Sequence, residues 1–218
     1  MTIVAVTGLQ REARIVAAPG IRVVIGGGDA TRLAAELDRA MEGARGVVSI
    51  GIAGALGPGW RPGDWAVARA VLDGGEAFPA DPAWAARLLS GLPGARAALF
   101  LGSDAMVAEA AAKAALHRDT GAEAVDMESH VAARVARRHG LPFVAARVIS
   151  DAADRTLPPA ARVGMRPDGG MDLGAVLRSL LSDPRQIPAL IRTGWEAERG
   201  FRALLRGHHR LGPGLAAP

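Results

Sequence analysis

The chain has 218 residues, of which 50% are hydrophobic and 22% are charged, so it is long enough for one α/β domain and its composition excludes extensive disorder. It has no cysteine, which excludes disulfides, thiolate zinc sites and cysteine nucleophiles, and no apolar run reaches the roughly 20 residues that span a bilayer. The net charge of +4 lies entirely in residues 184–218, which hold six arginines and two acidic residues, so the neutral remainder disfavours nucleic acid as a partner.

Apolar runs that end in glycine or polar residues predict the strands. The first run covers residues 2–6, and no basic stretch precedes it, so we expect a strand rather than a signal peptide and a cytoplasmic protein. Further strands are predicted at residues 22–25, 47–50, 65–71, 97–101, 124–126 and 143–149. Helical spacing and glycine stops predict helices that begin near residues 29–31 and cover 82–89, 107–120 and 129–139. We expect a loop at residues 156–172 and then helices with breaks at Pro184, Pro188, Gly194 and Gly200.

Continuous apolar strands that alternate with helices predict an α/β fold with a mostly parallel sheet covered on both faces. Ligands of such sheets bind beyond the carboxyl ends of the strands. Glycine and polar clusters follow the predicted strands at residues 8–12, 26–28, 51–54, 103–104, 126–128 and 150–151. We therefore expect the functional site at this edge of the sheet.

Each cluster, taken alone, also has a purely structural explanation. Residues 26–28 are three glycines that form either a tight strand–helix turn or a loop offering N–H groups to an anion, and they do not match the dinucleotide fingerprint. Glu128 can be explained as a carboxylate in the first turn of a helix, where the helix dipole favours it. Asp151 can be explained as a residue that caps a loop, and Glu12 as a solvated side chain. The chain also lacks a nucleophile elbow, a P-loop and zinc-ligand spacing, which disfavours those enzyme classes.

In combination, the clusters resemble a known family. A Gly8…Glu12 spacing, the glycine-rich turn, Gly-Ile-Ala-Gly at 51–54, Ser-Asp-Ala at 103–105, Val-Asp-Met-Glu at 125–128 and Arg-Val-Ile-Ser-Asp at 147–151 follow one another as in the nucleoside phosphorylase superfamily. The nearest enzymes are the methylthioadenosine/S-adenosylhomocysteine nucleosidases, and the sequence looks most like the hopanoid-associated phosphorylases, which are implicated in removing adenine from adenosylhopane. The resemblance covers roughly residues 1–180 and implies three layers, with a mostly parallel or mixed central sheet flanked by helices.

The resemblance implies roles for the site residues. Asp151 would hydrogen-bond or protonate N7 of the purine, so that the base leaves as a neutral molecule. Glu128 would hold the ribose hydroxyls, with Met127 against the sugar, and Glu12 would activate water. The other substrate-binding residues that it implies are Ser103, Met106, Ala53, Gly54 and Ser150.

The attacking group stays open between water and phosphate. Related phosphorylases carry an arginine near the 51–54 loop, and this chain has none between Arg45 and Arg61, whereas Glu12 favours water. The candidate phosphate contacts are Gly8, Arg11, Gly26, Gly27 and Gly28. The resemblance implies no metal and no organic cofactor, and phosphate would enter as a cosubstrate.

Residues 184–218 are predicted to form a basic amphipathic helical tail after a catalytic domain of residues 1–183. On a helix, seven apolar residues, Trp195 and Phe201 among them, gather about 120° from the arginines. Such a tail either makes a peripheral membrane contact or packs on the protein or on a partner subunit, and the family suggests a homodimer.

We therefore interpret the chain as an enzyme that cleaves the N-glycosidic bond of an adenosyl compound. The expected substrate is adenosylhopane, a lipid-linked nucleoside, and the product is adenine. Two alternatives stay open: a soluble methylthioadenosine/S-adenosylhomocysteine nucleosidase, and a nucleoside-binding scaffold without catalytic activity.

Overall fold

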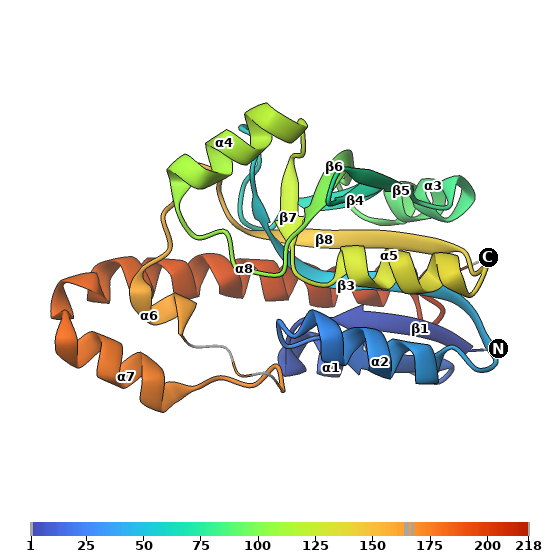
Figure 1. Ribbon diagram of the computed structural model, residues 1–218, viewed down its shortest axis with the longest axis horizontal. Helices are drawn as coiled ribbons and strands as arrows, with labels where there is room; N and C mark the ends of the chain where they lie inside the picture. The colour runs from blue at the N-terminus through green and yellow to red at the C-terminus, as the bar shows by residue number, and fades with distance from the viewer. Residues whose placement is uncertain (1, 164–165, 167, 218) are drawn as a thin grey trace.

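The computed structural model describes residues 2–163, 166 and 168–217 (Figure 1). Its strands are β1 (Thr2–Thr7), β2 (Ile21–Ile25), β3 (Ala44–Ala55), β4 (Trp65–Asp73), β5 (Glu76–Pro79), β6 (Arg96–Gly102), β7 (Ala124–Asp126) and β8 (Phe143–Asp151). Its helices are α1 (Gln10–Val16), α2 (Ala30–Ala40), α3 (Pro82–Gly91), α4 (Ala110–Thr120), α5 (Ser129–Arg138), α6 (Pro159–Arg162), α7 (Leu173–Ser182) and α8 (Ile187–Leu211), with a 3₁₀ turn, η1 (Pro184–Gln186), before α8.

Strand β3 is the centre of a mixed sheet. It runs parallel to β1 and β8, and its far end pairs antiparallel with β7 at Gly54 and Ala55. Strand β2 forms one edge beside β1, and β5 forms the other edge beside β4. Because β4 pairs with both β8 and β6, and β6 pairs with β7, five strands close into a small barrel. The predicted α/β fold with a mixed sheet is confirmed.

Helices cover both faces of the sheet, because the strands present valine, isoleucine and alanine on each face. On one face, α2 and α5 bury Leu33, Leu37 and Val131 against the strands. On the other face, α1, α3 and α8 bury Val16, Trp84 and Leu204. Figure 1 shows α2 and α5 in front of the sheet and α8 behind it.

The end of α8 and the residues after it belong to this core. Leu204 and Leu215 are fully buried, and the indole N–H of Trp84 donates to the carbonyl of Leu215 at 2.9 Å. A Cβ at Gly207 would lie 2.4 Å from the ring of Trp65, so only glycine allows α8 to approach β4 this closely. The division of the chain between residues 183 and 184 stays a prediction, and it coincides with the turn between α7 and α8.

The predicted breaks inside the last helix are wrong. Helix α8 is continuous through Gly194 and Gly200, and Pro188 stands in its first turn, where a missing N–H costs nothing. Gly200 faces the sheet, with Ile52 as its nearest neighbour. Packing on the sheet therefore outweighs the low helix propensity of Gly200, while Gly194 has no neighbour within 4 Å among the described residues and is carried along within the long helix.

Strand β3 is longer than expected, because residues 51–54, predicted to follow the strand, lie inside it and pair with β8 and β7. The other differences lie in short elements. The sequence analysis did not predict α1, β5 or α6, and α4 begins at Ala110, three residues later than expected. The predicted loop at 156–172 contains α6, and its residues 164–165 and 167 lie outside the described part of the chain. Among the described residues, no helix has both the length and the apolar character needed to cross a bilayer.

Candidate active site

Glu12 is held in place by three backbone N–H groups. It lies in the first turn of α1, directly after β1, where Oε2 accepts hydrogen bonds from Gly8 at 2.7 Å and Leu9 at 2.8 Å, and Oε1 accepts one from Ile52 at 2.7 Å. Burial raises the pKa of this carboxyl, although nearby Arg147 and the three N–H donors oppose the rise. The side chain is thus buried, fixed in orientation and not a solvated glutamate.

Arg147 lies beside Glu12 and organises the carboxylates around it. It is fully buried on β8, opposite Gly51 of β3. Its Nη2 donates to Oγ of Ser49 at 2.6 Å, and it lies 3.2 Å from Oδ1 of Asp126 and 3.3 Å from Oε2 of Glu128. One buried cation therefore holds two carboxylates and lies near a third.

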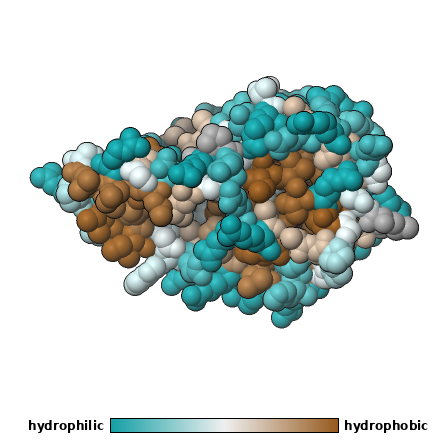
Figure 2. All heavy atoms as spheres, turned by 90° about the horizontal axis from the view of Figure 1, so that it is seen from below, coloured by the Kyte–Doolittle hydropathy of each residue, from teal (hydrophilic) through white to brown (hydrophobic). Residues whose placement is uncertain are grey.

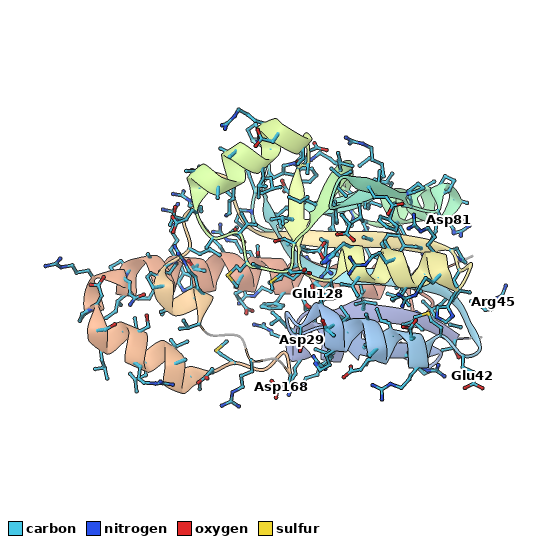
Figure 3. The ribbon with its side chains drawn as sticks, in the orientation of Figure 1. Asp29, Glu42, Arg45, Asp81, Glu128 and Asp168 are labelled. Atoms are coloured by element: carbon cyan, nitrogen blue, oxygen red, sulfur yellow. The ribbon has the colours of Figure 1, made fainter. Side chains whose placement is uncertain are left out.

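Glu128 also has a raised pKa. It lies between β7 and α5, at the centre of the molecule (Figure 3). Burial, with the like charges of Asp126 and Glu12, raises its pKa from 4.5 to about 8, although Arg147 partly opposes the rise. At neutral pH the carboxyl therefore holds a proton in the free protein, and it can donate as well as accept hydrogen bonds. Perturbed carboxyls of this kind are concentrated at functional sites.

Glycines make the space for these carboxyls. A Cβ at Gly26 would lie 2.5 Å from Cγ of Glu128, and a Cβ at Gly8 would lie 2.9 Å from its Oε1. A Cβ at Gly51 would lie 2.5 Å from Oε1 of Glu12. These three glycines are therefore required by close approach of side chains.

The predicted phosphate contacts have other partners in this structure. The N–H of Gly26 donates to the carbonyl of Thr7 at 2.7 Å, and the N–H of Gly27 donates to the carbonyl of Gly8 at 3.1 Å. Gly28 follows in the left-handed region, at φ 77°. The amide of Gly8 donates to Glu12, as described above. The turn is thus a strand–helix connection whose donors are largely used within the protein.

Arg11 points away from these glycines and toward α8. Its guanidinium pairs with Glu198 at 2.6 Å and lies 4.2 Å from the ring centroid of Phe201. It joins α1 to α8 and does not contact the glycine-rich turn in this conformation.

Asp151 ends β8 and has a partner that the sequence analysis missed. Its Oδ2 accepts from Nζ of Lys113 at 2.5 Å, and its Oδ1 accepts from Oγ of Ser150 at 2.7 Å. Lys113 is fully buried on α4 and also donates to the carbonyls of Ala152 and Arg155. It is the only lysine of the chain, and its place within the alanine run at residues 110–115 was the signal available in the sequence.

Asp151 lies at one end of a line of polar groups and Arg147 at the other. They are four residues apart on β8, so their Cα atoms are about 13 Å apart at the strand rise of about 3.3 Å per residue. Gly54 lies opposite Asp151 on β3, and a Cβ there would lie 3.2 Å from Oδ2. Ser150 Oγ also donates to the carbonyl of Ala53 at 3.2 Å.

Ser103 and Met106 lie beside this line, in the connection between β6 and α4. The N–H of Ser103 donates to the carbonyl of Asp126 at 3.0 Å. Met127 and Glu128 follow Asp126 in the chain, so Ser103 lies close to them in space. Ser103 and Met106 line a pocket of about 500 Å³ on the outer side of α4, which Glu12, Glu128 and Asp151 do not line. The structure thus brings Ser103 and Met106 close to the site, but both also line the separate pocket beside α4.

A larger pocket, of about 650 Å³, lies along β2 and α2 and contains none of the predicted substrate-binding or catalytic residues.

Within the described part of the chain, no group of three or more histidine, aspartate or glutamate side chains could hold a metal ion. The chemistry available at the site is therefore that of buried carboxyls and two buried cations.

Comparisons with known proteins point in one direction. A family model described as "Phosphorylase superfamily" matches residues 3–182. No curated protein matches the sequence significantly.

Solved structures match the fold. A methylthioadenosine/S-adenosylhomocysteine nucleosidase from S. pneumoniae, solved with a transition-state inhibitor, is 17% identical with a TM-score of 0.62, over 97% of this chain and all of that chain. A putative methylthioadenosine nucleosidase from Weissella paramesenteroides is 18% identical with a TM-score of 0.64, over 95% and 98%. Futalosine hydrolase of Helicobacter pylori is 15% identical with a TM-score of 0.61, over 96% and 97%.

Proposed function

Because the chain belongs to the phosphorylase superfamily, we propose that it cleaves the N-glycosidic bond of an adenosyl nucleoside by attack of water, with adenosylhopane as the substrate and adenine as a product. The family and the nucleosidase-like fold support N-ribosyl bond cleavage. The adenosylhopane assignment is supported by the resemblance of the sequence to the hopanoid-associated phosphorylases, in which the blocks at 125–128 and 147–151 are the most specific part.

In the proposed reaction, the C1′–N9 bond breaks and its electron pair moves into the purine. Asp151 takes up a proton from solvent when the nucleoside binds and passes it to N7, so adenine leaves as a neutral molecule, and the ammonium of Lys113 pairs with the carboxylate that remains. Glu128 holds the ribose hydroxyls and, when ionised, stabilises positive charge on the sugar. Glu12 takes a proton from the water molecule whose oxygen attacks C1′.

One observation favours water over phosphate. Both Glu12 and Glu128 lie against Gly8, while the amides of Gly26 and Gly27 are bonded to backbone carbonyls and Arg11 is paired with Glu198. A phosphate dianion would meet two carboxyls there. The sequence holds no arginine between Arg45 and Arg61, but the fold brings Arg147 opposite Gly51, and its Nε and Nη1 are the buried donors at this place without a partner among the described residues. Water needs a base and little else, and the fixed carboxyl of Glu12 supplies it.

The test is adenine release from adenosylhopane in detergent, with and without added phosphate, in the wild type and in Glu12→Gln. We expect release without phosphate, and a loss of about 10²–10⁴-fold in kcat for the variant. Release that requires phosphate would refute the role of water. If no adenosyl nucleoside releases adenine, the proposal that the chain is an enzyme is refuted, and a nucleoside-binding scaffold is favoured.

The second candidate is a methylthioadenosine/S-adenosylhomocysteine nucleosidase, favoured by the fold shared with the S. pneumoniae enzyme. It predicts release from methylthioadenosine and none from adenosylhopane in the same assay.

We further propose a homodimer that works without a metal or organic cofactor. Light scattering tests the first point and activity after dialysis against a chelator tests the second.

A further inference from the structure

Helix α7 is rich in leucine and yet buries no residue. Its sequence is LGAVLRSLLS, and the side chains of Leu173, Leu177 and Leu181 are 58% to 74% exposed. They recur every four residues, so they lie on one face of the helix. An isolated helix of ten residues is marginal in water, where tertiary packing of an apolar face normally supplies the stability. Helix α7 lacks such a cover within the described chain.

The start of α8 continues this apolar surface. Ile187, Ile191 and Trp195 recur with the same spacing and are 42% to 72% exposed, whereas Phe201 and Leu204, farther along α8, are buried. We call these six residues (Leu173, Leu177, Leu181, Ile187, Ile191 and Trp195) the apolar ridge. Figure 2 shows hydrophobic side chains gathered at this end of the molecule. An exposed apolar surface on the order of several hundred Å² marks an interaction site.

The turn between the two helices is firmly built. The side chain of Gln186 is buried, its Oε1 accepts from the N–H of Ala160 at 2.8 Å, and its Nε2 donates to the carbonyl of Ser179 at 2.7 Å. The amide thus ties α6 and α7 to the start of α8. The ridge is therefore presented on a defined hairpin, with its exposed side chains held outward.

Arginines without acidic partners flank the ridge. Among the described residues, Arg178 and Arg185 make no ion pair, while Asp172 and Asp183 accept hydrogen bonds from backbone N–H groups at helix starts. Helix α8 carries five arginines and two glutamates. A two-fold contact between two copies would bring these unpaired arginines toward one another. An anionic lipid surface would instead accept both the arginines and the apolar side chains.

We propose that the apolar ridge docks on an anionic lipid surface. The hairpin that carries the ridge is anchored at both ends on the start of α1, which holds Glu12: the N–H of Gln10 donates to the carbonyl of Gly169, four residues before α7, at 3.0 Å, and Arg11 pairs with Glu198 of α8. Resting on the proposed function, the docked protein would take nucleosides whose apolar substituent stays in the lipid phase.

Intrinsic fluorescence provides a direct test, because the chain has four tryptophans. Trp60, Trp65 and Trp84 are at most 5% exposed, whereas Trp195 is 72% exposed and lies on the ridge. We expect a blue shift of the emission on adding vesicles of phosphatidylcholine and phosphatidylglycerol at 3:1, and little shift with phosphatidylcholine alone. Co-sedimentation with the same vesicles gives the partition coefficient.

The double variant Leu177→Glu/Leu181→Glu should lower the partition coefficient more than tenfold and leave folding intact, because neither side chain is buried. Leu205→Glu is the matched control, since Leu205 is 42% exposed on α8 outside the ridge, and it should bind like the wild type. Arg178→Gln/Arg185→Gln should weaken binding to anionic vesicles.

Three results would overturn the proposal: no binding of the wild type to either vesicle, equal binding of the ridge variant, or a wild-type dimer that the ridge variant converts to a monomer without vesicle binding. Because no nucleoside is present, vesicle binding is read independently of adenine release. A failure of the proposed function would therefore leave this result standing.

Discussion

Replacing Glu128 with glutamine should remove a pH dependence from the stability of the protein. The pKa of Glu128 rises from 4.5 in the unfolded chain to about 8 in the fold, chiefly because the carboxyl is buried. Between these values the fold binds a proton that the unfolded chain releases. The free energy of unfolding is therefore greatest at low pH within this window and falls as the pH rises toward 8.

The size of the effect follows from one proton. The free energy of unfolding changes by about 1.4 kcal/mol per pH unit, so the wild type should lose about 3 kcal/mol relative to Glu128→Gln between about pH 5.5 and pH 7.5. Urea unfolding at several pH values measures this difference, and Glu42→Gln, at an exposed position, is the control. Parallel curves for the wild type and Glu128→Gln would refute the assignment of this proton to Glu128.

Further changes test the rest of the site. Asp151→Asn should lower kcat for adenine release by about 10²–10⁴-fold with an unchanged circular dichroism spectrum, and a loss below about threefold would contradict its role. Lys113→Met leaves the carboxylate of Asp151 buried without its cation and should cost about 3–5 kcal/mol in urea unfolding; an unchanged midpoint would show that the pair contributes nothing. Gly26→Ala places a Cβ 2.5 Å from Glu128 and should cost about 1–3 kcal/mol. Gly194→Ala, in open space inside α8, should instead raise the melting temperature by a few degrees, equivalent to about 1 kcal/mol.

The fold was predictable wherever local pattern determines structure. Buried parallel strands are continuous apolar runs, so residues 143–149 and 97–101 predicted β8 and β6 within two residues. The barrel closure was not predictable, because it depends on Gly54 and Ala55 pairing with β7, some 70 residues later in the chain. The same holds for the unbroken α8, in which Gly200 and Gly207 pack closely on the distant strands β3 and β4.

The candidate site divides in the same way. Glu12, Glu128 and Asp151 lie in polar clusters at or after the ends of strands, where ligands of such sheets bind, and the family resemblance then singled them out. Their electrostatic partners were not assigned. Arg147 lies within an apolar strand, and its proximity to Glu128 follows from the pairing of β8 with β3. Lys113 reaches Asp151 from a helix 38 residues earlier, and no spacing rule predicts that distance.

The burial of Leu215 against Trp84 has a consequence for how the protein is made in the cell. Trp65 and Trp84 are synthesised early, yet the side chains that cover them come from residues 203–215, among the last to be translated. Until then a nascent chain carries two exposed indoles and an open sheet face, which are features that chaperones and proteases recognise. A premature stop before α8 would therefore produce a chain that is degraded, rather than a smaller enzyme that still carries Glu12, Glu128 and Asp151.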